Sequence, residues 1–287
     1  MTGADVTAVL LISCPDQRGL VAGVSDFIHR HGGNIRSADQ HTDEQQSVFL
    51  QRVEWQLAGF DLARDEIAEA FRPLAERFSM TWQLRFSDQV GRVAILVSRL
   101  GHCLHDLLWR WQAGELPAEL TAVISNHAAL GGLARSAGIG FHVHEVRPET
   151  KAAAEARILE RLRELRVDLV VLARYMQVLT PEFVAAYPNR IINIHHSFLP
   201  AFTGAQPYRR AFERGVKVIG ATAHYATAEL DGGPIIEQDV VRVSHRDSVE
   251  DMVKKGRDLE RVVLGRAVDL HLHHRVLVYG NKTVVFD

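Results

Sequence analysis

The chain has 287 residues, of which 47% are hydrophobic and 24% charged, and its net charge is −2 at pH 7. This length predicts about two domains, and the composition excludes a disordered chain. The near-neutral charge favours neither a nucleic-acid-binding nor a membrane-surface protein, and no apolar run approaches the roughly 18 residues that span a bilayer.

The first 87 residues alternate between strand and helix patterns in the order βαββαβ. This order is typical of a ferredoxin-like unit. We therefore expect a first domain over residues 1–87. Its strands are expected at residues 6–13, 34–42, 47–55 and 80–86, and its helices at 19–31 and 62–78.

From residue 88 onward, strands alternate with helices. Such alternation favours a Rossmann-like α/β fold with a mostly parallel sheet covered by helices, over a second domain of residues 88–287. Strands are expected at residues 92–98, 120–125, 140–144, 167–173, 190–195, 218–225 and 235–243, and helices at 104–112, 128–136, 150–165 and 249–271. The last helix mixes charges of both signs, Glu260 among them, which indicates a solvated face.

The N-terminus has no basic segment before its apolar patch, and Cys14 and Cys103 lie far apart in the sequence. Neither a secretory signal nor a disulfide framework or CxxC knuckle is therefore expected. We expect a cytoplasmic protein. The histidines complete no recognisable ligand pattern with cysteines or carboxylates, so no metal is expected.

Asn193 and His195 interrupt a strongly apolar expected strand. Residues two apart in a strand share a face, so both side chains should point into one cavity, while His196 should point to the other side. By themselves the two residues could equally form a structural hydrogen-bonded pair.

A carboxylate, Asp231, stands directly before a Gly-Gly-Pro turn, where loops held by a sheet tend to place functional groups. An amide, an imidazole and a carboxylate together can polarise a carbonyl, stabilise an oxyanion and move protons. With Asn193 and His195, this residue predicts acyl- or formyl-group chemistry.

These residues carry a resemblance to known families. Asn193-Ile-His195, Ser197-Phe-Leu-Pro200 and Asp231 with His224 seven residues upstream resemble the folate-dependent formyltransferases, the family of glycinamide ribonucleotide transformylase, over roughly residues 92–277. The segment Cys14-Pro-Asp-Gln-Arg-Gly-Leu20 and the later Gly33-Asn-Ile35 resemble an ACT domain. An ACT domain fused to this catalytic fold is the arrangement of the formyltetrahydrofolate deformylases.

The resemblance implies roles for individual residues. Asn193, His195 and Asp231 would be catalytic, and His224 would support Asp231. The folate pocket would include Arg174, Tyr175, Met176, Val178 and Leu179, whereas the Arg found in many relatives is replaced here by Gln177. The ACT domain implies a homo-oligomer, a dimer or tetramer, and an amino-acid effector contacted by Gly19, Asn34 and Ile35.

The loop after the first strand of the second domain indicates which molecule accepts the formyl group. Transformylases with a phosphorylated acceptor carry Gly-Asn-Gly-Ser-Asn-Leu there, whose backbone N–H groups hold phosphate. This chain has one glycine in Ser98–Leu104, and the bulky Leu100 and His102 should obstruct such a cradle. Water is then the expected acceptor, and the reaction is hydrolysis of 10-formyltetrahydrofolate to formate and tetrahydrofolate.

In this hydrolysis Asn193 and a protonated His195 would stabilise the formyl oxyanion while Asp231 assists water, with no metal or redox cofactor. His102 and Cys103 would line the water side of the active site or cap the helix that follows. Two alternatives remain open: a formyltransferase that uses an amine acceptor, and a non-catalytic sensor of folate and amino acid.

Overall fold

The computed structural model describes residues 6–201 and 207–286. The described residues form two compact units, one of residues 6–90, 273–279 and 283–286, and the other of residues 91–272 and 280–282. The first boundary lies close to the expected one after residue 87. The C-terminal residues differ from expectation, because most of 273–286 packs with the first unit.

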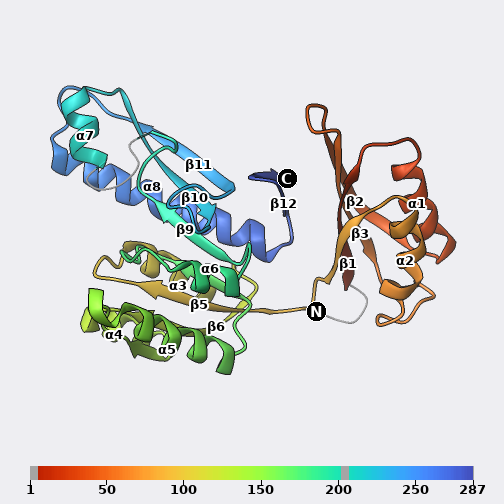
Figure 1. Ribbon diagram of the computed structural model, residues 1–287, viewed down its shortest axis with the longest axis horizontal. Helices are drawn as coiled ribbons and strands as arrows, with labels where there is room; N and C mark the ends of the chain where they lie inside the picture. Colours follow the sequence, from red (N-terminus) through yellow and green to blue (C-terminus); the bar gives the residue numbers. More distant parts are fainter. Residues whose placement is uncertain (1–5, 202–206, 287) are drawn as a thin grey trace. The chain divides into compact units, whose positions relative to one another are not determined.

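Unit 1 has the expected βαββαβ order (Figure 1). Its antiparallel sheet has the strand order β2-β3-β1-β4. The helices pack on one face through a buried cluster that joins alternate β1 residues, such as Leu10 and Ile12, to Val24 of α1 and Phe71 of α2. The bounds are β1 Thr7–Pro15, α1 Leu20–Arg30, β2 Asn34–Asp43, β3 Val48–Gln56, α2 Ile67–Arg77 and β4 Thr81–Phe86.

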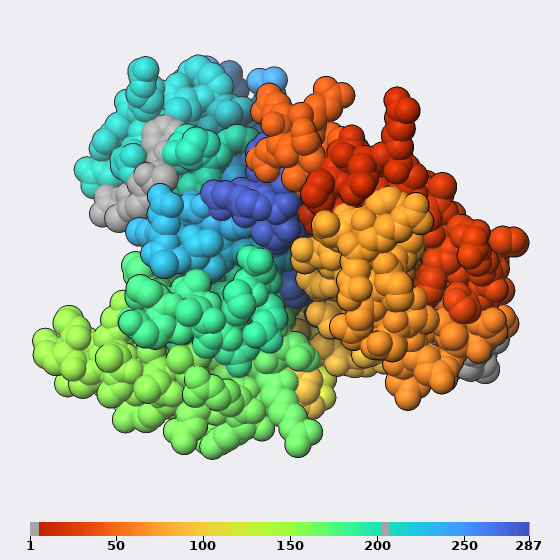
Figure 2. Space-filling model, turned by 45° about the vertical axis from the view of Figure 1, so that its right-hand side comes forward, coloured from red at the N-terminus to blue at the C-terminus, as the bar shows by residue number. Residues whose placement is uncertain are grey.

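A C-terminal hairpin, which the sequence pattern did not predict, covers part of the other face of this sheet. It consists of β12 (Val276–Tyr279) and β13 (Lys282–Val285). Leu277 and Phe286 join Leu11 of β1 and Leu50 of β3 in a separate buried cluster. In Figure 2 the dark blue C-terminal residues lie against the red and orange surface of unit 1. Both faces of β1 are therefore buried. Its even-numbered residues pack against the helices, whereas Leu11 packs against the hairpin.

Unit 2 contains, in its described residues, a seven-stranded sheet of order β11-β10-β9-β8-β5-β6-β7 (Figure 1). Strands β5 to β9 run parallel, whereas β10 and β11 are antiparallel to their neighbours. This confirms the expected α/β fold. The bounds are β5 Gly91–Val97, α3 His102–Gln112, β6 Ala118–Ser125, α4 Gly131–Ser136, β7 Phe141–Val143, α5 Lys151–Glu164, β8 Leu169–Leu172, α6 Pro181–Ala186, β9 Ile191–His195, α7 Pro207–Arg214, β10 Val218–Tyr225, β11 Ile235–Arg242 and α8 Val249–Leu272.

The centre of this sheet is fully buried, and its strands point their carboxyl ends to one edge. All four residues of β8 are buried, as its continuous apolar sequence predicts. Helices α6 and α7 were not predicted from the sequence pattern. Because β5, β8 and β9 are parallel and adjacent, the residues that follow them gather at the same edge, where α/β folds bind ligands.

Within the described part of the chain, none of the helices combines the length and the apolar character needed to cross a membrane.

Candidate active site

A cavity of about 830 Å³ lies within unit 2. Asn193 and His195 of β9, His224 of β10 and Asp231 of the following loop all line it. The structure therefore brings together the four residues that the sequence resemblance singled out, although Asp231 is 38 positions beyond Asn193 in the chain (231 − 193).

Asn193 is oriented by a histidine on the neighbouring strand. The two residues are directly opposite in the β9–β10 register, and Asn193 Nδ2 lies 3.1 Å from His224 Nε2. His224 Nδ1 lies 3.0 Å from the Tyr225 carbonyl oxygen, which can only accept, so Nδ1 carries the proton and Nε2 accepts from Asn193. Burial lowers the pKa of His224, which keeps the imidazole neutral and this tautomer in place.

His195 and Asp231 form the second pair of the site. His195 Nδ1 lies 3.1 Å from Asp231 Oδ1, and both side chains are more than nine-tenths buried. Asp231 has a φ of +56°, a left-handed conformation that a non-glycine residue adopts at some energetic cost. Burial by itself would raise the pKa of Asp231, but the hydrogen bond and charge of His195, together with His224, lower it. The carboxylate is therefore ionised at neutral pH.

The other ring nitrogen of His195 has no partner in the part of the chain that the structure describes. His195 Nε2 is buried and makes no hydrogen bond to any described residue. An unsatisfied buried polar atom costs stability, so such atoms are uncommon unless a ligand completes them. Nε2 is thus available to a group bound in the cavity.

His196 does not point away from the site, contrary to the expectation from strand alternation. It lines the same cavity, and its ring centroid lies 5.2 Å from that of His195. The alternation fails because β9 ends at His195. Burial and then the positive charge of Arg174 lower the pKa of His196 to about 4, so this imidazole is neutral at pH 7.

The predicted folate segment also lines the cavity, Gln177 included. Tyr175 and Leu179 are buried, whereas Met176 and Val178 are more than half exposed at the rim. The Met176 N–H donates to Ser98 Oγ at 2.9 Å, which ties this segment to the end of β5. The segment thus offers apolar walls and one charged residue, Arg174.

A second polar network lies in the cavity wall and was missed in the sequence. Glu260 of α8 is 1% exposed, so its assignment to a solvated helix face was wrong. Its carboxylate accepts hydrogen bonds from Tyr208 Oη at 2.6 Å and from His102 Nε2 at 2.7 Å, and Arg174 Nε lies 3.4 Å away. Burial would raise the pKa of Glu260, but His102, Arg174 and Tyr208 lower it.

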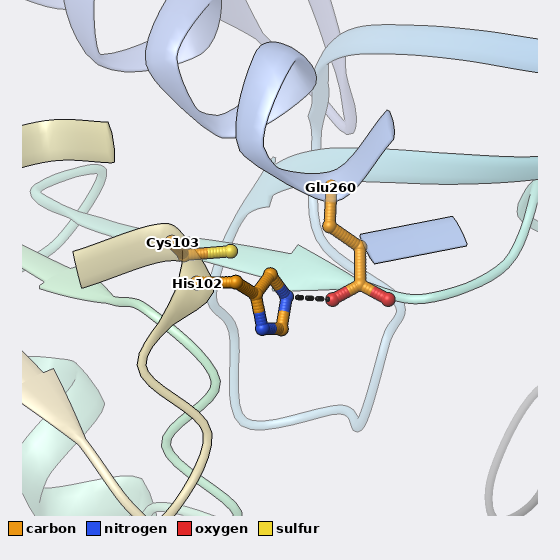
Figure 3. A group of neighbouring side chains, drawn as sticks. All are labelled: His102, Cys103 and Glu260. Atoms are coloured by element: carbon orange, nitrogen blue, oxygen red, sulfur yellow. Dashed lines mark hydrogen bonds and ion pairs between the residues drawn. The ribbon is translucent and has the colours of Figure 1, made fainter. Parts of the chain in front are cut away.

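Figure 3 shows His102 and Cys103, from the start of α3, beside Glu260. Their potential metal-ligating atoms all lie within 4.8 Å of one another. However, both Glu260 oxygens already accept hydrogen bonds, and burial raises the pKa of the Cys103 thiol, which disfavours the thiolate that a metal needs. We interpret the group as a hydrogen-bonded network. His102 lines the cavity, whereas Cys103 is completely buried behind it.

The three predicted effector contacts belong to unit 1. Gly19 precedes α1 with a φ of +92°, Asn34 Nδ2 donates to Gln56 Oε1 at 2.8 Å, and Ile35 packs against the helix-covered core. Their role as effector contacts stays a prediction.

Comparison with known proteins agrees with this architecture. A formyl transferase family model matches residues 91–268, and an ACT domain model matches residues 8–76. The fold and the site together define a formyl-transferase-type enzyme that carries an ACT domain. Among solved structures, glycinamide ribonucleotide transformylase 1 from Symbiobacterium toebii has a TM-score of 0.66 and 36% identity, covering 71% of this chain and 98% of its own.

Other relatives match over both units. A formyltetrahydrofolate deformylase from Synechocystis sp. is 60% identical over 98% of this chain and 99% of its own length. The crystal structure of a formyltetrahydrofolate deformylase from Pseudomonas syringae pv. tomato has a TM-score of 0.96 and 50% identity, covering 98% of this chain and 95% of its own. The chain belongs to the formyltetrahydrofolate deformylase family.

Proposed function

We propose that this enzyme hydrolyses 10-formyltetrahydrofolate to formate and tetrahydrofolate, and that Asn193, His195 and Asp231 carry the reaction. The observation that supports this most directly is the convergence of the three side chains in one cavity, with His195 Nε2 buried and unpaired among the described residues. The similarity of the whole chain to deformylases, rather than of unit 2 alone, supports the same reaction.

Asn193 and His195 stabilise the oxyanion. The Asn193 amide has two N–H donors, and His224 uses one of them, so the other can donate to the formyl oxygen. His195 donates from Nε2, while Asp231 stabilises its imidazolium form through Nδ1. Both bonds strengthen as negative charge develops on the oxygen, and losing one such donor in other enzymes costs about 2.7 to 4 kcal/mol.

Asp231 removes the proton from the attacking water. Its Oδ1 faces His195, whereas Oδ2 has no hydrogen-bond partner among the described residues and is free to accept from water. The water oxygen bonds to the formyl carbon as its proton passes to Asp231. His195 Nε2 then protonates N10, the bond between the carbon and N10 breaks, and the formic acid released ionises to formate.

Another part of the cavity wall favours water as the acceptor. Leu100, His102, Tyr208 and Glu260 line the cavity, and the last three are joined by hydrogen bonds. An amine acceptor would have to disrupt a buried, charged network, whereas water requires no such space.

The test is a formate-release assay on the purified full chain with 10-formyltetrahydrofolate and no amine acceptor. We expect the wild-type enzyme to release formate, and Asp231→Asn to lower kcat by at least about 100-fold while KM changes less than about threefold. Asp258→Asn, at an exposed carboxylate paired with Arg261, is the matched control and should keep full activity.

Loss of 10-formyltetrahydrofolate only when an amine is added, with the formyl group recovered on that amine and no formate released, would identify a transferase instead. Wild-type turnover by Asp231→Asn would refute the assigned mechanism. Binding of folate without any turnover would indicate a sensor.

This chemistry calls for no metal or redox cofactor, since the oxyanion and the proton are both handled by side chains. We further propose a cytoplasmic homo-oligomer whose ACT domain binds an amino acid near Gly19, Asn34 and Ile35. Formate release measured with and without glycine and methionine tests the effector.

A further inference from the structure

Arg174 occupies an unusual position at the carboxyl end of β8. Its φ is +64°, in the left-handed region that residues other than glycine seldom adopt. Its side chain is 10% exposed and lines the same cavity as His195 and His196. Strained backbone is retained where the surroundings fix it, and it clusters at functional sites. The conformation therefore marks Arg174 as a residue whose placement matters.

The guanidinium of Arg174 has few partners for its five N–H donors. Within the described residues its one ion pair is with Glu260, whose Oε2 lies 3.4 Å from Nε, and Nε is buried without a hydrogen bond. Glu260 is in turn held by short hydrogen bonds from His102 and Tyr208. Glu260 thus leaves most of the donor capacity of Arg174 unused.

Arg174 shares its cavity with the proposed catalytic residues. The His196 ring lies near the rings of His195 and Tyr208, with centroids 5.2 and 5.9 Å away, and is tilted against both. After burial, the charge of Arg174 is the strongest influence on the pKa of His196, and it exceeds the opposite influence of Glu260. The charge of Arg174 therefore acts on the part of the cavity that His196 lines.

We propose that Arg174 forms a subsite for a small carboxylate, and that its occupant is formate, the product of the hydrolysis. The inference rests on the proposed function, because only hydrolysis produces formate in this cavity. A guanidinium presents two parallel N–H groups that match the two oxygens of a carboxylate. Formate released beside His195 would meet this guanidinium within the same cavity.

The same chemistry could serve the glutamate carboxylates of the folate, and the experiment separates the two sources. The first arm measures product inhibition by added formate, and binding of ¹³C-formate by NMR in the presence of tetrahydrofolate, on the full-length wild-type enzyme. Arg174→Gln should weaken formate inhibition and binding by about tenfold or more, because a charge-assisted bidentate pair is lost. Arg174→Lys keeps the charge but loses the paired N–H groups of the guanidinium. Its formate affinity should lie between those of wild type and Arg174→Gln.

The matched control is Arg161→Gln on α5, where the arginine pairs with Glu164 at the surface. It should leave formate inhibition unchanged. Because Arg174→Gln leaves Glu260 without its cation, thermal unfolding is measured in parallel. A double variant, Arg174→Gln with Glu260→Gln, removes both charges and should show the same loss of formate binding.

The second arm compares 10-formyltetrahydrofolate with 10-formyltetrahydropteroate, which lacks the glutamate. The proposal expects Arg174→Gln to change KM for both substrates by the same factor. A larger KM effect on the glutamate-bearing substrate alone would overturn it and assign Arg174 to the folate tail.

Formate affinity equal in wild type and Arg174→Gln, or wild-type enzyme that does not bind formate, would also overturn it. If the wild-type enzyme released no formate from its substrate, the proposed function would fail, whereas added formate would still test the subsite directly.

Discussion

His224 sets the orientation of Asn193, the residue that we propose to contact the formyl oxygen. Its Nδ1 is tied to the Tyr225 carbonyl, which leaves Nε2 as a fixed acceptor for Asn193 at 3.1 Å. The arrangement fixes one N–H of the Asn193 amide and so directs the other. His224 is 2% exposed, so water does not compete for this hydrogen bond.

We expect His224→Phe to lower kcat for formate release by about 10- to 100-fold with little change in KM, because the amide loses its orienting acceptor in the transition state. His224→Gln supplies both an acceptor and a donor and should recover part of the loss. Steady-state kinetics of the two variants check this. Equal kcat for wild type and His224→Phe would show that Asn193 is oriented by other contacts.

At the scale of elements, the turn between β10 and β11 sets the position of Asp231. Gly233 packs directly against the backbone of Tyr225. A Cβ at this position would lie 1.8 Å from the Tyr225 carbonyl oxygen. A Cβ on the adjacent Gly232 would meet the side chain of Glu229 at 2.7 Å, and that exposed side chain can move. A side chain at position 232 can therefore be accommodated by a movement of Glu229, whereas one at position 233 would require the backbone to move.

Gly233→Ala should displace the turn and Asp231 with it, lowering kcat by about tenfold or more, since a misplacement near 1 Å is costly to catalysis. Gly232→Ala is the matched control and should stay within about twofold of wild type. Formate-release kinetics with thermal unfolding distinguish the two. Normal kcat in a folded Gly233→Ala enzyme would contradict the assigned role of this turn.

On the scale of the whole molecule, the chain returns to unit 1 at its C-terminal end. His274 sits at this return, and its carbonyl accepts a hydrogen bond from Arg52 Nε at 3.1 Å. Burial, followed by the charges of Arg85 and Arg52, lowers the pKa of His274 to about 4. In the unfolded chain this histidine has its ordinary pKa of about 6.5. Between about pH 6.5 and pH 4 it is therefore protonated in the unfolded chain and neutral in the folded one.

The free energy of unfolding of unit 1 should consequently fall as the pH drops from about 6.5 to about 4, and His274 contributes nothing further below that. We expect its share to be on the order of 2 kcal/mol. Hydrogen exchange of β1 amides across this pH range measures it. His274→Asn should reduce the dependence of the unfolding free energy on pH, and asparagine tolerates the φ of +54° at this position. His29→Asn, on the exposed face of α1, should leave that dependence unchanged. If the unfolding free energy changed equally with pH in wild type and His274→Asn, the role given to His274 would be refuted.

Local patterns explain which elements were predictable. The strand at Val218–Tyr225 has the expected bounds, and the helix at Val249–Leu272 begins at the expected residue. The hairpin β12–β13, with four residues in each strand, was not predicted from the sequence pattern. Glu260 was mispredicted from its charged neighbours, although helical spacing from Met252 and Gly256 places it on the buried face.

The sequence by itself determined the two folding patterns and the pair Asn193 and His195, because strand and helix periods are properties of neighbouring residues. It also singled out Asp231 through its turn and the family resemblance. Only the tertiary structure decided that His196 and Glu260 share the cavity and that Arg174 pairs with Glu260. Their proximity depends on which strands are adjacent and where a long helix crosses them, and no spacing along the chain encodes such distances.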